Sequence, residues 1–236
     1  MHKNVYIIGL GGIGSCLCEP ICRFLNYQND AGDYTITLID GDQYSRSNLT
    51  RQYFHDSDID ENKAKIQYDM MKKKFYNISL DYKDIYLNEQ NIKDLIQDNS
   101  IILGGVDNHK TRHLIQKYAE YVLHNVLYIS GGNDYYIGDI FVYAKKNGEQ
   151  LSPTIYQNNK DIMFPTDKLP DELGCDELVE SEPQLLFTNG TASMCIQWAF
   201  YNYYQLFDKD IEIIKNDIKF DILEMAVLSS HRKIKK

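Results

Sequence analysis

The chain has 236 residues, of which 43% are hydrophobic and 25% are charged, and its formal net charge is −9. This length allows a sizeable core, whereas the acidic balance argues against a protein whose main task is to coat nucleic acid, because phosphate binding requires a basic face. The five cysteines are odd in number, irregularly spaced and without a Cys-x-x-Cys pair, which argues against a disulfide framework and against a structural zinc site.

The N-terminus and the distribution of apolar residues indicate a cytoplasmic protein. Residues 1–4 lead directly into an apolar strand, without a charged-then-apolar leader. No uninterrupted apolar run is long enough to cross a membrane. We therefore expect no membrane partner, and the net negative charge disfavours a nucleic-acid partner.

The first part of the chain alternates between short apolar runs and longer amphipathic segments. Strands are predicted at residues 5–8, 34–39, 78–86, 100–104 and 127–130, and helices at residues 15–27, 63–75, 92–97 and 110–123. Residues 43–61 are polar and irregular, which predicts a loop with short helical turns. Strands that alternate with helices in this way are typical of a parallel sheet with helices on both faces.

The pattern changes after residue 138. A strand is predicted at residues 139–143, and residues 145–183 are polar and contain four of the five prolines. A run of that length without periodicity indicates a functional crossover or lid. We then predict an apolar helix capped by residues 188–191, a final strand at 221–228 and a basic tail at 231–236 that frays.

These elements predict an α/β fold. We expect a Rossmann-like, doubly wound, mainly parallel sheet with antiparallel C-terminal strands and a long crossover loop. Residues 1–236 should form one domain, in which residues 1–143 are the nucleotide-binding half and residues 144–236 supply the crossover loop, the C-terminal helix and the last strand.

The turn between the first strand and the first helix reads Gly9-Leu-Gly11-Gly12-Ile13-Gly14. Glycines permit a tight turn, and backbone N–H groups at the positive end of a helix can approach phosphate oxygens. Asp40 ends the second strand, where a carboxylate can hydrogen-bond the hydroxyls of a ribose. A nucleotide is therefore predicted, although many dehydrogenases and methyltransferases share this turn.

Charged residues farther along the chain favour a nucleoside triphosphate. Arg51 and Lys63 follow the second strand, and Asp107 follows the strand at 100–104. The carboxyl ends of parallel strands line one crevice, so these side chains should approach Asp40 and the glycine turn. Two cations and a carboxylate suit a magnesium-bound triphosphate, whereas a nicotinamide dinucleotide has less charge to neutralise.

Several short segments together are specific for one protein family through their order and spacing, although no single segment is specific by itself. They are Gly9–Gly14, Leu38–Asp42, Ser47–Gln52, Lys63–Ala64, Asp107–Arg112 and Ser130–Gly132, together with Gly138. In this combination, over roughly residues 4 to 143, the chain resembles the ThiF/MoeB/HesA family, the bacterial relatives of ubiquitin-activating enzymes.

The resemblance implies roles for individual residues. It implies that Asp40 binds the ribose, that Arg51 and Lys63 hold phosphates, and that Asp107 binds magnesium. The other residues that it places in the cofactor-binding pocket are Gly9, Gly11, Gly12, Ile13, Gly14, Asp42, Asn48, Gln52, Asn108 and Arg112. The cofactors implied are ATP and Mg²⁺.

The resemblance also implies a reaction. A carboxylate, usually the C-terminal glycine of a ubiquitin-like protein or peptide, attacks the α-phosphate of ATP and yields an acyl-adenylate and pyrophosphate. A carboxylate is already ionised at neutral pH, so no general base is needed. Positioning and charge neutralisation then lower the barrier. A homodimer is expected from the resemblance alone.

The sequence departs from the family pattern at two points. Many members carry a zinc site of two Cys-x-x-Cys pairs, which are absent here, so the loop after Tyr143 must be held in another way. Members often begin with a helical arm whose arginine reaches into the partner's site. This sequence begins at the first strand, so we expect that arginine to be missing or replaced.

Cysteine and histidine offer weaker candidates. Cys175 lies where some relatives keep a reactive cysteine, and it could accept the acyl group as a thioester or form a persulfide link. Its many acidic neighbours would raise the pKa of the thiol, which favours an incidental loop cysteine. The cysteines at 16, 18, 22 and 195 are expected to be buried. His109 and His113 share a helix face but have no third ligand in sight.

Three other functions remain open. The same fold modifies a tRNA base with ATP in some relatives, although the acidic charge weighs against tRNA. A nicotinamide-dependent oxidoreductase would explain only the glycine turn and Asp40. A non-catalytic partner subunit would have no reason to keep Arg51, Lys63 and Asp107.

Overall fold

A computed structural model describes residues 4–157, 159–169, 172, 184–206 and 215–234. Its centre is a nine-stranded sheet in the order β3-β2-β1-β4-β5-β6-β8-β9, with β7 paired to β6. The strands are β1 (Asn4–Ile8), β2 (Thr35–Ile39), β3 (Ser79–Lys83), β4 (Ser100–Gly104), β5 (Val126–Asn133), β6 (Ile137–Lys146), β7 (Glu149–Gln150), β8 (Asp217–Asp221) and β9 (Ala226–Ser230).

The first five strands are parallel to one another, and β6, β8 and β9 continue the sheet in antiparallel register. Central strands β1 and β4 are apolar and buried, which is typical of a sheet covered on both faces. The predicted fold class, a mainly parallel doubly wound sheet with antiparallel C-terminal strands, is therefore confirmed.

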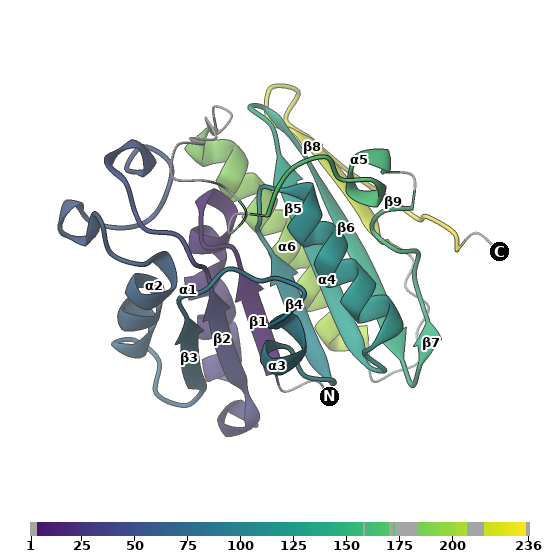
Figure 1. Cartoon of the computed structure of the whole chain (residues 1–236), viewed down its shortest axis with the longest axis horizontal. Helices are drawn as coiled ribbons and strands as arrows, with labels where there is room; N and C mark the ends of the chain where they lie inside the picture. The colour runs from purple at the N-terminus through teal and green to yellow at the C-terminus, as the bar shows by residue number, and fades with distance from the viewer. Residues whose placement is uncertain (1–3, 158, 170–171, 173–183, 207–214, 235–236) are drawn as a thin grey trace.

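Helices form a layer on each face of the sheet (Figure 1). The helices are α1 (Gly12–Asn26), α2 (Lys63–Lys72), α3 (Ile92–Leu95), α4 (His109–Tyr121), α5 (Lys160–Met163) and α6 (Leu186–Leu206), with short 3₁₀ turns at Ala31–Asp33, Arg46–Asn48 and Asp56–Asp58. The first core, on one face, includes residues of α1, α2 and α6, and the second, on the other face, includes residues of α3, α4 and α5. No helix in the described ranges combines the length and the apolar character that a membrane crossing requires.

The crossover after β7 begins as a strap, described at residues 151–157 and 159–169, that lies against α4. The backbone N–H of Ile155 donates to Gln116 Oε1 at 3.0 Å. The ring nitrogen Nδ1 of His113 lies 3.0 Å from the carbonyl oxygen of Ile162, and Asp167 Oδ2 accepts from the N–H of His109 at 2.6 Å. These contacts attach the described part of the strap to α4 and so support the chain after Tyr143.

Two C-terminal elements differ from the prediction. The predicted strand at 221–228 is wrong, because the chain turns at residues 222–225 between β8 and β9. Asp221 Oδ1 accepts from the N–H groups of Leu223 and Glu224, which closes this turn, and Met225 takes a positive φ of 51°. The prediction followed the apolar residues of this segment and missed the capping aspartate.

The basic tail was also predicted wrongly at Arg232, which is buried. Its guanidinium donates to the carbonyl oxygens of Thr154 at 2.9 Å and Asn216 at 3.0 Å and lies over the ring of Phe141. Backbone carbonyls from distant segments therefore hold Arg232 in place, and the sequence pattern around it does not reveal them.

Candidate functional site

At Gly9 and Gly14, neighbouring backbone leaves no room for a side chain in the turn between β1 and α1. Gly9 has a φ of +80°, and a Cβ there would lie 2.8 Å from Val106 Cγ1. A Cβ on Gly14 would overlap the carbonyl oxygen of Gly9. Glycine is therefore required at both positions by packing as well as by backbone conformation.

The N-terminus of α1 is open toward the solvent side of this turn. Its N-cap residue, Gly11, has no side chain, so the N–H groups of the first helical turn have no side-chain cap. A Cβ on Gly11 would meet only Gln52 Nε2, at 3.7 Å, within 4 Å among the described residues. Room and N–H donors at the positive end of a helix are the requirements of a phosphate site. The side chain of Ile13 instead joins the core.

Asp40 follows the last residue of β2, and its carboxylate contacts the glycine turn. Its Oδ2 accepts from the N–H of Leu10 at 2.5 Å, and its Oδ1 accepts from the N–H of Asp42 at 2.9 Å. Burial raises the pKa of the Asp40 carboxyl, and the charge of Lys63 and these N–H groups oppose the rise. Asp40 thus ties the second strand to the glycine turn.

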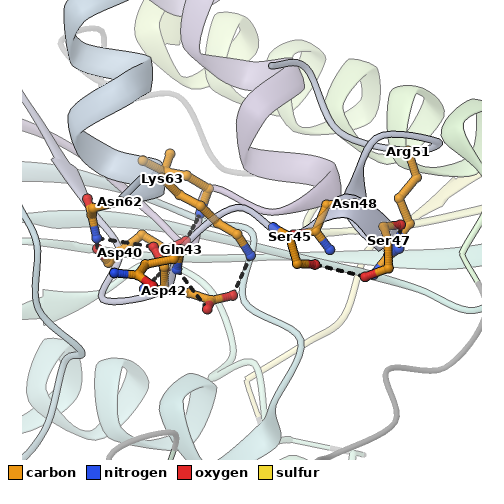
Figure 2. A network of polar contacts seen from close by, with 10 residues as sticks. Asp40, Asp42, Gln43, Ser45, Ser47, Asn48, Arg51, Asn62 and Lys63 are labelled. Carbon is orange, nitrogen blue, oxygen red and sulfur yellow. Dashed lines mark hydrogen bonds and ion pairs between the residues drawn. The ribbon is translucent and has the colours of Figure 1, made fainter. Parts of the chain in front are cut away.

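Lys63 is buried at the start of α2 and forms an ion pair with the half-exposed Asp42 (Figure 2). Asn62, the N-cap of α2, supports this pair. Its Nδ2 donates to the carbonyl oxygens of Asp40 at 2.9 Å and Asp42 at 3.1 Å. The structure therefore brings three predicted residues together, and Asn62 is a support that the sequence reasoning missed.

The polar loop after β2 presents Arg51 and Gln52 beside the turn. Buried Asn48 shapes the loop, since its Oδ1 accepts from the N–H of Ser45 at 3.1 Å. Arg51 Nη1 donates to the carbonyl oxygen of Ser47 at 2.8 Å (Figure 2). The side chain of Gln52 is buried, and its Oε1 has no hydrogen-bond partner among the described residues.

A second group of charges follows β4. Asp107 is exposed, and Asn108 caps α4 by accepting from the N–H of Thr111 at 2.7 Å. The guanidinium of Arg112 donates to the carbonyl oxygens of Val106 at 2.8 Å and Gly131 at 3.2 Å. Burial lowers the pKa of Arg112, and no carboxylate of the described residues lies within ion-pair distance of it.

The two groups of charges lie at the same edge of the sheet. Asp40 follows β2 and Asp107 follows β4, and β1 lies between these two strands. Neighbouring strands are separated by about 4.8 Å, so about 10 Å separates the strand ends that carry the two carboxylates. A nucleotide bound over the glycine turn can span that distance between the two groups.

Asn189 is a further residue of the site that the sequence reasoning missed. It was predicted within a helix cap, but α6 begins earlier, at Leu186, and the N–H of Asn189 donates to the carbonyl oxygen of Leu185 at 3.0 Å. Its buried side chain occupies the space where a Cβ on Gly12 would lie. A polar residue inside an apolar helix was the signal available in the sequence.

Unpartnered buried oxygens test whether this site fits a nucleotide. Asn189 Oδ1 and Gln52 Oε1 both lie beside the glycine turn, and neither has a hydrogen-bond partner among the described residues. A buried polar atom without a partner is costly. Both amide side chains border Gly11 or Gly12 at the start of α1, so a small rotation would let donors of a bound nucleotide or its water reach these oxygens. The residues present fit such a ligand.

The cysteines and histidines complete the predicted candidates. Cys175 lies outside the described residues. Cys18, Cys22 and Cys195 are buried as predicted, whereas Cys16 is partly exposed. Burial raises the pKa of Cys16 to about 11 and that of Cys22 to about 12, so neither forms a thiolate readily. In the part of the chain that the structure describes, no three His, Cys, Asp or Glu side chains form a metal-binding group.

Comparisons with known proteins agree with this geometry. The sequence matches the ThiF family over residues 1–198. The molybdopterin-synthase adenylyltransferase of Escherichia coli (strain K12) is 30% identical over 148 residues, which are 62% of this chain and 56% of that protein. The SAMP-activating enzyme E1 of Haloferax volcanii is 23% identical over 133 residues, which are 54% of this chain and 47% of that enzyme.

Solved structures share the fold. The crystal structure of E. coli MccB with ATP superposes with a TM-score of 0.70 and 18% identity, and it covers 99% of this chain and 64% of MccB. At this identity the likeness shows the fold alone. The chain spans less than two-thirds of the length of each of these three proteins.

Proposed function

This chain belongs to the ThiF family, and on that premise we propose that it is an ATP-dependent adenylyltransferase that activates a carboxylate of a protein or peptide. In its finer form, the proposal takes this carboxylate to be the C-terminal glycine of a small ubiquitin-like protein or peptide. The observation that carries the proposal is the presence of Lys63, Arg51 and Arg112 at the sheet edge where the glycine turn opens. The adenylyltransferase named among the relatives supports it.

The cations supply the charge that a triphosphate requires. The N–H groups at the start of α1, together with Lys63 and Arg51, receive phosphate oxygens, and Asp40 accepts from the ribose hydroxyls. Arg112 has no carboxylate partner within ion-pair distance among the described residues, so its charge can neutralise a further anionic group of the nucleotide. Preorganised cations of this kind cost little rearrangement when charge develops.

Asp107 is the residue that we propose to hold Mg²⁺. Its exposed carboxylate accepts no hydrogen bond from any described residue, which fits an oxygen ligand of a hard cation. When bound, the ion supplies positive charge to the phosphate oxygens. One carboxylate with water and phosphate oxygens is an ordinary ligand set for Mg²⁺.

The proposed reaction forms one bond and breaks another. An oxygen of the substrate carboxylate attacks the α-phosphorus, and the bond from that phosphorus to the oxygen bridging the β-phosphate breaks. Its electron pair leaves with pyrophosphate, and the acyl group remains on AMP. The carboxylate is already ionised, so the side chains of this chain position and neutralise rather than remove a proton.

Pyrophosphate exchange into ATP tests the proposal. With Mg²⁺ and peptides that end in glycine, exchange should require both the peptide and Asp107. We expect Asp107→Ala to reduce the exchange rate by about 100-fold or more, because the metal loses its protein ligand. Asp84→Ala is the matched control, since Asp84 is exposed at the carboxyl end of β3.

Full exchange by Asp107→Ala would overturn the metal assignment. Tight binding of NADH without binding of ATP would overturn the whole proposal in favour of an oxidoreductase. Exchange stimulated by tRNA and by no carboxylate would favour base modification.

Two further parts of the proposal concern Cys175 and the assembly. The acidic neighbours of Cys175 favour an incidental cysteine, and acceptance of the acyl group is the alternative. Complete transfer of product by Cys175→Ala would support the incidental role, and loss of transfer would support acceptance. The homodimer stays a proposal, which a molecular mass from light scattering tests. Met194, Trp198 and Tyr201, which are exposed at helical spacing along α6, supply an apolar face that supports it.

A further inference from the structure

An apolar groove lies between the first turns of α6 and the turn that joins β8 to β9. Its lining includes Phe187 of α6 and Ile222, Met225 and Val227 of the β8–β9 hairpin. Phe187 is 75% exposed and Met225 is 93% exposed, so large apolar side chains face solvent here. The groove has a volume of about 290 Å³, which is small for a nucleotide-sized ligand and suits one or two side chains.

The groove opens at the same edge of the sheet as the glycine turn. Strand β5 is parallel to β4, so the turn after Asn133 lies at the carboxyl edge. Ile137 pairs with Asp221, which brings the β8–β9 turn to this edge as well (Figure 1). The N–H of Ile222 donates to the carbonyl oxygen of Tyr136 at 3.0 Å, so the two turns are joined.

The first turn of α6 connects the groove to the nucleotide side. Phe187 lines the groove, whereas Asn189, two residues later, packs on Gly12 and donates to the carbonyl oxygen of Arg51 at 3.4 Å. Between them, Thr188 Oγ1 donates to the carbonyl oxygen of Tyr135 at 2.6 Å and fixes this turn to the sheet. One helical turn therefore has the groove on one face and the glycine turn on the other.

We propose that the groove receives an apolar side chain of the polypeptide substrate, a few residues before its reacting carboxylate. This inference rests on the proposed function and narrows the substrate class to chains with such a residue. A helix with its side chains is about 10 Å across, and an extended chain advances about 3.3 Å per residue. The apolar residue is therefore expected about three residues before the terminal carboxylate.

A charged substitution at the exposed Met225 tests whether the groove binds an apolar side chain of the substrate. A charge at Met225 would face the apolar side chain of the substrate and disfavour its burial. Met225→Asp should raise KM for the peptide about tenfold and leave KM for ATP unchanged, because loss of one buried apolar contact affects peptide binding alone. Leu228→Asp is the matched control, since Leu228 is 71% exposed on β9 and does not line the groove.

Synthetic heptapeptides ending in glycine provide the probe for pyrophosphate exchange. A single leucine is moved from two to six residues before the carboxylate, in an otherwise polar peptide. Exchange should be fastest with the leucine about three residues before the end, and Met225→Asp should remove that preference. Val227→Asp is a second groove variant in case Met225→Asp is poorly folded.

The outcomes separate the inference from the proposed function. Exchange that is equal for every leucine position and in every variant would overturn the groove assignment while keeping the adenylyltransferase. If no peptide supports exchange and the protein does not bind ATP, the proposed function itself is overturned. A changed molecular mass of Met225→Asp with unchanged peptide KM would assign the groove to a second copy of this chain.

Discussion

The charge of Lys63 is partnered before a nucleotide arrives. Its ammonium group is buried, but its partner Asp42 has half of its side chain exposed to solvent. An ion pair that reaches water contributes little to stability, so phosphate oxygens can replace Asp42 at low cost. The pair therefore holds the lysine in position without competing strongly with a polyanion.

The ionisation of Asp40 makes the stability of the fold depend on pH. Burial raises its pKa above the ordinary value of 3.8, so the folded protein binds this proton more tightly than the unfolded chain does. The free energy of unfolding of the wild type, relative to Asp40→Asn, should therefore fall as the pH rises from about 4 through the folded pKa. Above that pKa the difference should be constant.

Urea denaturation at a series of pH values measures this difference. The amide side chain introduced by Asp40→Asn does not titrate, so subtracting the free energy of unfolding of this variant removes the general effect of pH. A difference that grows with rising pH would show that the N–H groups of Leu10 and Asp42 and the charge of Lys63 outweigh the burial of Asp40.

At the scale of elements, α4 and the strap act as one unit. The N–H groups of His109 and Lys110 lie 2.6 Å and 3.4 Å from Asp167 Oδ2, at the positive end of the helix. A carboxylate at this end is favoured by the helix dipole as well as by the hydrogen bonds. The same helix end carries Asp107 and Arg112, so the strap is attached close to the proposed metal ligand.

We expect Asp167→Asn to loosen this attachment. Loss of the charge at the helix end should cost about 1 kcal/mol of local stability. Amide hydrogen exchange should accelerate in residues 160–169 and in the first turn of α4, while β1 and β4 stay protected. Asp161→Asn is the control, because Asp161 is exposed on the same strap and does not cap α4. Equal exchange in both variants would contradict the role of Asp167.

At the scale of the whole molecule, Arg232 joins the C-terminus to the strap and the sheet. Its guanidinium reaches carbonyl oxygens of the strap and of the residue before β8, and it lies 3.8 Å from the carboxylate of Asp217. Because the side chain is buried, Arg232→Ala leaves several polar groups without partners.

Denaturation of the full chain tests this connection. Arg232→Ala should lower the free energy of unfolding by about 3 kcal/mol, whereas Lys233→Ala, whose side chain is exposed, should have little effect. Equal midpoints for the two variants would mean that the tail contributes nothing to the fold.

The sequence predicts the parallel half of this molecule well because its signals are local. Apolar runs mark β1 and β4, and Asp40 and Asp107 follow strands whose ends meet at one edge. The contacts of Asn189 with Gly12 and of Arg232 with the strap join segments more than 70 residues apart. No periodicity encodes such contacts, so the support of the site became visible only in three dimensions.

The close packing around the glycine turn affects which of its residues homologues would retain after losing ATP binding. Gly9 and Gly14 are required by neighbouring backbone atoms whether or not a ligand is present. A lineage that stopped using ATP would still keep both glycines, because a folded copy needs them. Asp107 is exposed and accepts no hydrogen bond from any described residue, so its persistence or loss would record whether the site is still at work.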